Sequence, residues 1–341
     1  MMDSMVGMHP FFILGAPRSG TSLLSRILNS HPVIAVPDET KIFETFVPLL
    51  PLYGDLEHPA RLGRLLDDVL AWRWVRRIPN LPHRDAVLTN LKRRSLGGVF
   101  EALLSTWARN EGKQCWGEKS PNHVFWWHFM SESFPDARVI HIVRDGRDVA
   151  LSLIKAPFGP KTVAAAAHRW VQFVERVRKI GSSIGADRYI EIRYEDLLSR
   201  PSEVITRVLA LLGQPFDPAV LQFHVDARPV DTDPVNNANI LRPIQVMNKD
   251  KWRSALDNSS LKIFEAIAGS TLEACGYERA TNARSMHQME LFLRRYVEHA
   301  PVKAAAMLRN RAGIEEGIER ERIRWRLLSD GLRGQIAPVP R

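Results

Sequence analysis

The sequence predicts an α/β fold in which a central parallel sheet lies between two layers of helices. Helical patterns separate short apolar segments, as parallel β-α-β connections require. Short apolar runs of this kind suit strands that are buried on both faces, and the last three of them lack the clean polar alternation of a solvated strand. A third observation is that charged or polar residues follow each of them. The predicted strands are Phe11–Leu14, Val33–Val36, Arg138–Val143 and Tyr189–Arg193.

The first predicted helix, Thr21–Leu28, follows the first strand at once and ends near Asn29–Pro32, because Pro32 disfavours helix at His31. Ser120 is expected to cap a helix over Asn122–Ser133, with Pro121 at its first position. Amphipathic periodicity predicts further helices, and Gly276 is well placed to end the last of them. These helices are Asp55–Arg77, Ser95–Asn110, Ala164–Ile180 and Leu261–Ala274.

Residues 1–280 are interpreted as one domain with a helical insert at about 55–133 that shapes an acceptor pocket, followed by a basic helical extension, 281–341. The extension is expected to form charged helices over Met286–His299 and Ile314–Leu328 and a disordered end over Ile336–Arg341. It is interpreted as a packing arm or dimer element, with binding to a membrane surface as the alternative. The tryptophans of the insert are interpreted as packing anchors, and otherwise as an aromatic wall of the pocket. They are Trp72, Trp74, Trp107, Trp126 and Trp127.

The composition is that of an ordinary globular protein, with a formal net charge of +9 and a pI near 9.8. This balance fits an anionic ligand, and no compact Lys/Arg block or nucleic-acid motif points to DNA or RNA. Cys115 and Cys275 form no Cys-x-x-Cys pair, and His123 and His128 are five residues apart, so no disulfide framework or zinc site is predicted. The apolar run near the start is too short for a signal-peptide core, and we expect a cytoplasmic protein.

A glycine-containing loop between the first strand and the first helix predicts a phosphate site. Backbone N–H groups and the positive end of the helix dipole converge at such a loop, and Arg18 adds a charge with bidentate reach. Gly15 and Gly20 have the spacing of the nucleotide-triphosphate loop, but Thr21 stands where that motif has lysine. This argues against ATP or GTP hydrolysis. A plain strand–helix turn and a P-loop kinase acting on a small alcohol are the alternatives.

A second basic loop, Arg144–Asp148, follows the third predicted strand. Gly146 permits a tight turn into a helix, and Ser152 lies about two helical turns beyond Arg144. Two separate phosphate sites at one sheet edge imply a ligand such as an adenosine with 3′ and 5′ groups. The alternative is that Arg144 forms a structural ion pair with Asp145 or Asp148.

Here the sequence resembles a known family. Ala16-Pro-Arg-Ser-Gly-Thr-Ser22 is similar to the 5′-phosphosulfate loop of the PAPS-dependent sulfotransferases, where PAPS is 3′-phosphoadenosine 5′-phosphosulfate. Val143-Arg-Asp-Gly-Arg-Asp-Val-Ala-Leu-Ser152 resembles their 3′-phosphate motif. Two later segments, Arg193–Leu197 and Asn248–Arg253, resemble family elements in the right order. Pro37–Lys41 and Gly117–His123 look most like tyrosylprotein sulfotransferases and related bacterial enzymes, although Lys41 replaces an arginine.

The resemblance implies a P-loop NTPase-like fold and transfer of a sulfuryl group from PAPS to a hydroxyl or amine, leaving PAP, without a metal. Glu39 would be the general base, and Asp38 is the competing candidate. The alternative is that Glu39 is a structural loop acid paired to Lys41. The acceptor would be a small molecule, sugar, lipid or peptide, and a homodimer is one arrangement. Arg18, Thr21, Ser22 and Lys119 would stabilise the leaving group. The implied nucleotide contacts are Arg18, Ser19, Gly20, Thr21, Ser22, Arg144, Ser152 and, more weakly, Tyr194 and Lys251. A non-catalytic nucleotide-binding module is the remaining alternative.

Overall fold

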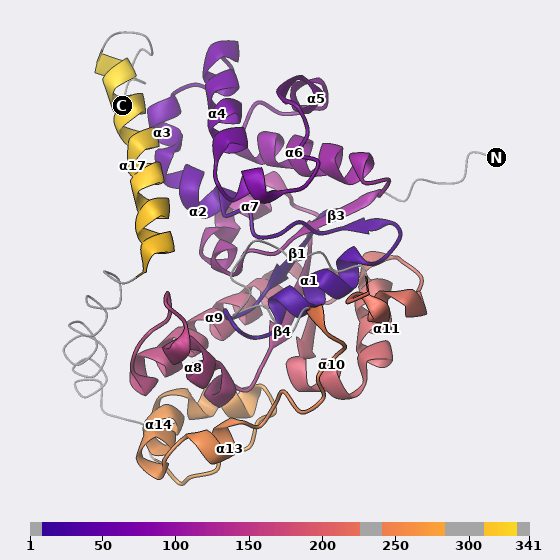
Figure 1. Cartoon of the computed structure of the whole chain (residues 1–341), viewed down its shortest axis with the longest axis vertical. Coiled ribbons are helices and arrows are strands. Elements are labelled where there is room, and N and C mark those ends of the chain that lie inside the picture. The colour runs from indigo at the N-terminus through magenta and orange to yellow at the C-terminus, as the bar shows by residue number, and fades with distance from the viewer. Residues whose placement is uncertain (1–8, 226–240, 284–309, 333–341) are drawn as a thin grey trace. The chain divides into compact units, whose positions relative to one another are not determined.

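A computed structural model describes residues 9–225, 241–283 and 310–332, and contains one five-stranded sheet (Figure 1). The strand order is β2-β3-β1-β4-β5, and the pairs β2·β3, β1·β3 and β4·β5 are parallel. The predicted α/β fold class with a parallel sheet is therefore confirmed. The strands are β1 (Phe11–Leu14), β2 (Ile34–Ala35), β3 (Cys115–Glu118), β4 (Arg138–Val143) and β5 (Tyr189–Arg193).

One strand is absent from the sequence prediction. The four residues of β3 are all buried, but their sequence, Cys-Trp-Gly-Glu, has neither β-branched residues nor an apolar run. It lies inside the segment 55–133 that was expected to be a helical insert, so that segment also supplies part of the sheet. Gly117 is required here, because a Cβ atom at this position would lie 2.3 Å from the Phe11 ring on β1.

The chain forms two compact units, described here separately. Of the described residues, the first contains 9–13, 25–138 and 315–332, and the second contains 14–24, 139–225, 241–283 and 310–314. In the first, aromatic rings of Phe12, Phe43, Phe100 and Phe134 pack with centroid separations of 4.7–6.5 Å. Its helices include α2 (Ile42–Phe46), η1 (Val47–Leu49), α3 (Leu50–Tyr53), α4 (Pro59–Ala71), η2 (Val75–Arg77), α5 (Arg84–Thr89), α6 (Leu96–Asn110), η3 (Pro121–Trp126) and α7 (Trp127–Ser133).

Two helical segments of the first unit begin at a proline, and both differ from the helices predicted there. The expected helix Asp55–Arg77 begins only at Pro59, after His58 accepts a hydrogen bond from the Ala60 N–H, and ends at Ala71. Pro121 begins a 3-10 segment rather than an α-helix, and Ser120 does not cap it. The Ser120 hydroxyl donates to Glu118 instead, so the predicted capping role is wrong.

Two of the five tryptophans are packing anchors, as predicted. Trp72 and Trp107 are buried, and their indole N–H groups donate to the carbonyl oxygens of Thr40 (3.2 Å) and Pro79 (2.9 Å). Buried Trp side chains usually satisfy their N–H in this way. Trp74 differs, because it is only half-buried and carries two cations over its ring.

Helix α17 (Arg311–Leu332) confirms the helix expected over Ile314–Leu328 and lies beside α3 and α4 (Figure 1). Ile323 and Leu327 are buried, and ion pairs join the helix to α4 and the residues after it, including Arg64–Asp330 at 2.5 Å and Arg73–Glu315 at 2.9 Å. The elements expected over 286–299 and 336–341 fall outside the described residues. In the part of the chain that the structure describes, no helix combines the length and apolar character of a membrane span.

Glu316 on α17 offers a test of this docking. Its carboxylate accepts hydrogen bonds from the Lys41 ammonium (2.8 Å) and the Trp74 indole (3.0 Å). We expect Glu316→Gln to lower the free energy of unfolding by about 1 kcal/mol, because a partly buried charged acceptor is lost. Glu321→Gln on the same helix, with an exposed partner, should change it by less than about 0.5 kcal/mol. Urea denaturation measures both, and equal values would contradict the docking role.

In the second unit, α8 and α14 pack against α9, where Trp170 and Phe264 meet at 6.1 Å. Gly276 follows α14 with a φ of +74°, the conformation predicted for a helix end. The helices are α1 (Thr21–Asn29, which begins in this unit), α8 (Gly146–Lys155), α9 (Val163–Ile184), α10 (Tyr194–Ser199), α11 (Pro201–Leu212), η4 (Pro218–Gln222), α13 (Trp252–Ala255) and α14 (Asn258–Ala274).

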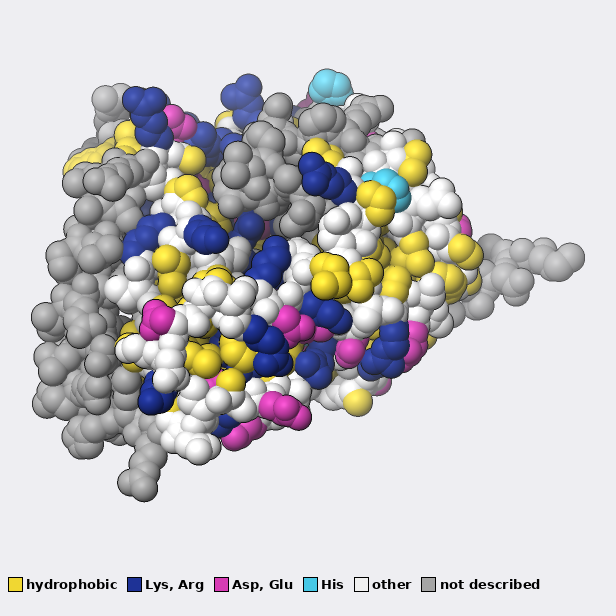
Figure 2. All heavy atoms as spheres, turned by 60° about the horizontal axis from the view of Figure 1, so that its bottom comes forward, with side chains coloured by type: hydrophobic (Ala, Val, Ile, Leu, Met, Phe, Trp, Pro, Cys, Tyr) yellow, Lys and Arg dark blue, Asp and Glu magenta, His cyan; other side chains and the backbone are white. Residues whose placement is uncertain are grey.

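On the face seen in Figure 2, the basic side chains do not form one continuous patch. Lys and Arg side chains are distributed over that face, with Asp and Glu side chains among them. A net charge of +9 spread in this way attracts anions in general and selects no particular one. The selection has to come from a site with fixed geometry.

Candidate functional site

The loop between β1 and α1 forms a tight turn. Ser19 N–H donates to the Ala16 carbonyl (3.1 Å), and two residues adopt positive φ, Arg18 at 75° and Gly20 at 97°. Helix α1 begins at Thr21, directly after the turn. The turn therefore leads into the positive end of a nine-residue helix, which is a suitable place for a phosphate.

Polar groups line this loop. Ser19 is 1% exposed, and among the described residues its hydroxyl has no hydrogen-bond partner. Thr21 is 4% exposed at the first position of α1, and Ser22 beside it is half-buried. A buried hydroxyl without a partner costs free energy, and a bound phosphate oxygen would satisfy it.

Gly20 has no room for a side chain. A Cβ atom would lie 2.4 Å from the Tyr194 ring, and the positive φ disfavours any L-residue. We expect Gly20→Ala to lower the free energy of unfolding by about 2 kcal/mol. Gly112→Ala is the control, because Gly112 has φ +72° with no atom within 4 Å of its Cβ position. If thermal unfolding shifted equally in both variants, close packing against Tyr194 would not be the cause.

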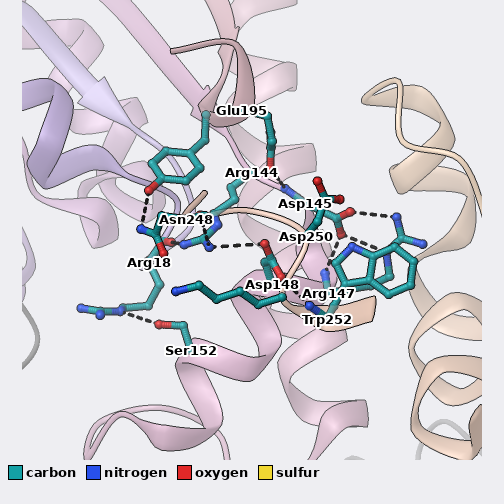
Figure 3. A network of polar contacts seen from close by, with 12 residues as sticks. Arg18, Arg144, Asp145, Arg147, Asp148, Ser152, Glu195, Asn248, Asp250 and Trp252 are labelled. Atoms are coloured by element: carbon teal, nitrogen blue, oxygen red, sulfur yellow. Dashed lines mark hydrogen bonds and ion pairs between the residues drawn. The ribbon is translucent and has the colours of Figure 1, made fainter. Parts of the chain in front are cut away.

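Arg144, at the end of β4, lies against the same loop. It is 8% exposed, and one Nη donates to the Arg18 carbonyl (3.3 Å) while the other donates to the Asn248 carbonyl (3.1 Å) (Figure 3). Its guanidinium covers the Tyr194 ring at 4.6 Å, and its Nε has no partner in residues 9–225, 241–283 or 310–332. The structure thus brings the two predicted basic loops into contact within one unit.

The side chain of Arg18 reaches away from its own loop. Its Nε donates to the Ser152 hydroxyl on α8 at 2.9 Å (Figure 3). By sequence, Arg18 was grouped with the first phosphate and Ser152 with the second. In the structure Arg18 connects the two groups, with its backbone in the first loop and its guanidinium beside Ser152.

The second arginine of the basic loop is structural. Arg147 forms a two-pronged pair with Asp145 (3.0 and 2.8 Å) and a third bond with Glu265 (2.8 Å), and it lies over Trp252. Asp145 is therefore taken by Arg147 rather than by Arg144. The Glu195 carboxylate accepts from the Asp145 N–H (3.0 Å), which fixes the start of α8.

Asp148 joins the basic loop to the segment before α13. Its carboxylate accepts from the Trp252 N–H (2.9 Å) and lies 3.4 Å from an Arg144 Nη, so one of the two expected structural pairings of Arg144 is present. Burial raises the pKa of Asp148 and outweighs the opposing effect of Arg144. The anchored segment presents Asn248, whose amide donates to the Tyr194 hydroxyl (2.8 Å). Asn248 received no role from the sequence, whereas Lys251, which did, is exposed at the start of α13.

The predicted catalytic carboxylate lies in the first unit. The Lys119 ammonium donates to Glu39 Oε1 at 2.8 Å, and the Lys119 side chain is 6% exposed against 28% for Glu39. Asp38 lies instead 3.9 Å from Arg26. Lys41 pairs with Glu316, so the alternative in which Glu39 pairs with Lys41 is wrong. The structure therefore joins two of the predicted catalytic residues directly.

A buried carboxylate that the sequence analysis left without a role supports this pair. Glu118 is 1% exposed and accepts hydrogen bonds from the Thr40 N–H (3.1 Å) and hydroxyl (3.0 Å). Its second oxygen lies 2.9 Å from Nδ1 of the fully buried His123. Burial opposes both charges, but their mutual attraction prevails, so the pKa of Glu118 is lowered and that of His123 is raised. The motif Gly117–His123 contained both residues, but 78 residues separate Glu118 from Thr40.

Known proteins share this arrangement of elements. A sulfotransferase domain from the Synechococcus PCC 7002 olefin synthase is 25% identical, with a TM-score of 0.55 over 79% of this chain and 95% of that domain. A sulfotransferase domain from the curacin biosynthetic pathway has the same fold, with a TM-score of 0.51, 20% identity, and coverage of 79% and 98%. The P-loop-like α/β fold predicted from the sequence is therefore confirmed.

Curated relatives give the same result. The nodulation protein NoeE of Sinorhizobium fredii is 26% identical over 296 residues, which cover 79% of this chain and 66% of NoeE. The protein-tyrosine sulfotransferase of Drosophila melanogaster is 23% identical, over 80% of this chain and 52% of that protein. The chain thus spans about half to two thirds of these relatives. Residues 10–218 match the model described as "Sulfotransferase family". Because this match covers more than half of the chain, this chain belongs to the Sulfotransferase family.

Proposed function

We propose that this protein transfers a sulfuryl group from PAPS to a hydroxyl-bearing acceptor. The observation that carries the proposal is the contact between the two basic loops, in which Arg144 bonds the Arg18 carbonyl and Arg18 bonds Ser152. One adenosine with phosphates at both its 3′ and 5′ positions matches two adjoining anion sites. A nucleoside triphosphate, with a single chain of phosphates, does not need the second site.

In this proposal Arg144 and Ser152 hold the 3′-phosphate, with Tyr194 and Lys251 as further nucleotide contacts. The unpartnered Nε of Arg144 is a donor that the phosphate would satisfy. Ser19, Gly20, Thr21 and Ser22 hold the 5′-phosphosulfate through hydroxyls and backbone N–H groups at the start of α1. This assignment gives the unpartnered Ser19 hydroxyl an acceptor.

The chemical step assigned to the first unit is proton removal. Glu39 takes the proton from the acceptor hydroxyl. As the acceptor oxygen bonds to sulfur, the bond between sulfur and the 5′-phosphate oxygen breaks. Lys119 stabilises the negative charge that the leaving PAP acquires on its 5′-phosphate. The role predicted for Arg18 in this step is not carried over, because the Arg18 guanidinium lies beside Ser152, which is assigned to the 3′-phosphate. The proposal assigns this charge stabilisation to side-chain cations and requires no metal. Glu39 is partly exposed, as a group that meets an acceptor must be.

The acceptor is proposed only as a class. The name of the Drosophila relative specifies protein tyrosine, a phenolic hydroxyl, whereas that of NoeE specifies nodulation alone. A hydroxyl on a small molecule, sugar, lipid or peptide satisfies the Glu39 mechanism equally. An amine acceptor would use the same base.

Calorimetry with PAP, 5′-AMP and Mg-ATP tests the nucleotide. We expect PAP to bind most tightly, because it alone has phosphates at both ends of the adenosine. Tighter binding of Mg-ATP would favour the kinase alternative and reject the proposal. Labelled PAPS is then offered with p-nitrophenol, glucose, hexanol and a tyrosyl peptide, each with and without EDTA. Binding of PAP without transfer to any probe would favour a non-catalytic nucleotide-binding module.

A further inference from the structure

The Glu39–Lys119 pair is one of two parallel links between the same two segments. Lys119 donates to Glu39 at 2.8 Å, and the preceding residue, Glu118, accepts from the hydroxyl of Thr40, the residue after Glu39, at 3.0 Å. A second bond to Glu118 comes from the Thr40 N–H at 3.1 Å. The Glu118 links are fully buried, whereas the Glu39 link is partly exposed.

Every polar atom of Thr40 is engaged. Its N–H and hydroxyl donate to Glu118, and its carbonyl accepts from the buried Trp72 indole at 3.2 Å. The next residue, Lys41, has φ +52° and donates its N–H to the Ser120 hydroxyl (3.3 Å). The backbone beyond Glu39 is therefore held at consecutive residues, although it lies in a loop.

Such a buried carboxylate is costly unless it has fixed partners. Nδ1 of the buried His123 lies 2.9 Å from the Glu118 oxygen that Thr40 does not use. An apolar residue at position 118 would avoid that cost but could not accept from the Thr40 N–H. A charged acceptor holds the loop with stronger hydrogen bonds than a neutral one.

We propose that Glu118 is a positioning residue that sets the Glu39 carboxylate against the Lys119 ammonium by holding Thr40. This inference rests on the proposed function, because it gives Glu118 a purpose only if Glu39 acts in catalysis. Glu118 itself touches no reacting atom. Its effect is confined to the place and orientation of Glu39 and Lys119.

The test is a double-mutant cycle on turnover. Thr40→Val keeps the size and shape of the side chain but removes the hydroxyl bond to Glu118. We expect kcat to fall about tenfold in the wild-type background, because small displacements of a catalytic group are costly. In the Glu39→Gln background it should fall less than twofold, since the positioned base is already gone. The KM for PAPS should not change, and Thr40→Ser should restore kcat.

Thr106→Val is the matched control, because Thr106 is a buried threonine on α6 and accepts a hydrogen bond from Arg109. Its kcat should equal that of the wild type. The acceptor is whichever of the four probes of the screen gives the highest turnover. Thermal unfolding of each variant identifies any general loss of structure. Equal losses of kcat from Thr40→Val in both backgrounds would reduce Thr40 to a structural role and overturn the proposal.

Glu118→Gln gives a readout that does not depend on activity. We expect the Thr40 amide hydrogen to exchange with solvent at least tenfold faster in this variant, because its charged acceptor becomes neutral. Unchanged exchange would show that Glu118 does not hold the loop. Failure of the proposed function looks different, since the wild type would then transfer no sulfuryl group, or Glu39→Gln would keep full turnover, while the exchange at Thr40 still responds to Glu118.

Discussion

Replacing Arg144 by methionine is expected to raise the Kd for PAP about 100-fold or more. Methionine keeps much of the length of the arginine side chain but has no charge and no donor. Arg144 is 8% exposed, so its interaction with a phosphate is shielded from water and worth several kcal/mol, unlike an exposed ion pair. Isothermal calorimetry with PAP measures the change directly.

The ligand supplies the control for this variant. The nucleotide 5′-AMP lacks the 3′-phosphate, so Arg144→Met should change its Kd less than threefold. Arg207→Met, on the exposed face of α11, should change neither Kd. Arg144 also bonds the carbonyls of Arg18 and Asn248, and urea denaturation therefore accompanies the titrations. Equal losses for PAP and 5′-AMP would mean that Arg144 maintains the fold of the loops and does not bind the 3′-phosphate.

Local sequence was sufficient for most of the sheet. Four strands were predicted because each is a short apolar segment followed by a turn and a helix. The fifth, β3, carries Gly117 and Glu118, and a glycine and an acid in four residues are untypical of a strand. Its place between β2 and β1 is decided by packing partners far along the chain, such as Phe11 against Gly117. A local pattern contains no information about such partners.

The same distinction divides the candidate site. The two basic loops could be predicted, because each is a continuous motif whose turn and helix start are local. The contacts that organise the first unit could not, since Thr40 and Glu118 are 78 residues apart and Lys41 and Glu316 are 275 apart. The hydrogen bond from Arg18 to Ser152 joins residues 134 apart in the sequence, which no local pattern encodes. The roles of these residues remain predictions.

The second large effect is expected for Glu39, where removal of the carboxylate should lower kcat about 100-fold or more. General-base catalysis typically contributes that much or more. Glu39→Ala also removes the carboxylate that accepts a 2.8 Å hydrogen bond from the buried Lys119 ammonium. Glu39→Gln avoids this complication, because its amide oxygen can still accept from Lys119 but cannot take a proton under the reaction conditions. If the loss arises from the missing base, both variants should lose turnover to a similar extent.

Binding separates the base from a nucleotide contact. Glu39 lies in the first unit and the proposed phosphate contacts lie mainly in the second, so the Kd for PAP should stay within about threefold of wild type in both variants. A parallel loss of affinity and turnover would assign Glu39 to binding. Asp38→Asn decides between the neighbouring acids. Asp38 faces Arg26 at 3.9 Å, and its replacement should leave most of the turnover. A large loss in Asp38→Asn together with full activity in Glu39→Gln would transfer the role of base to Asp38.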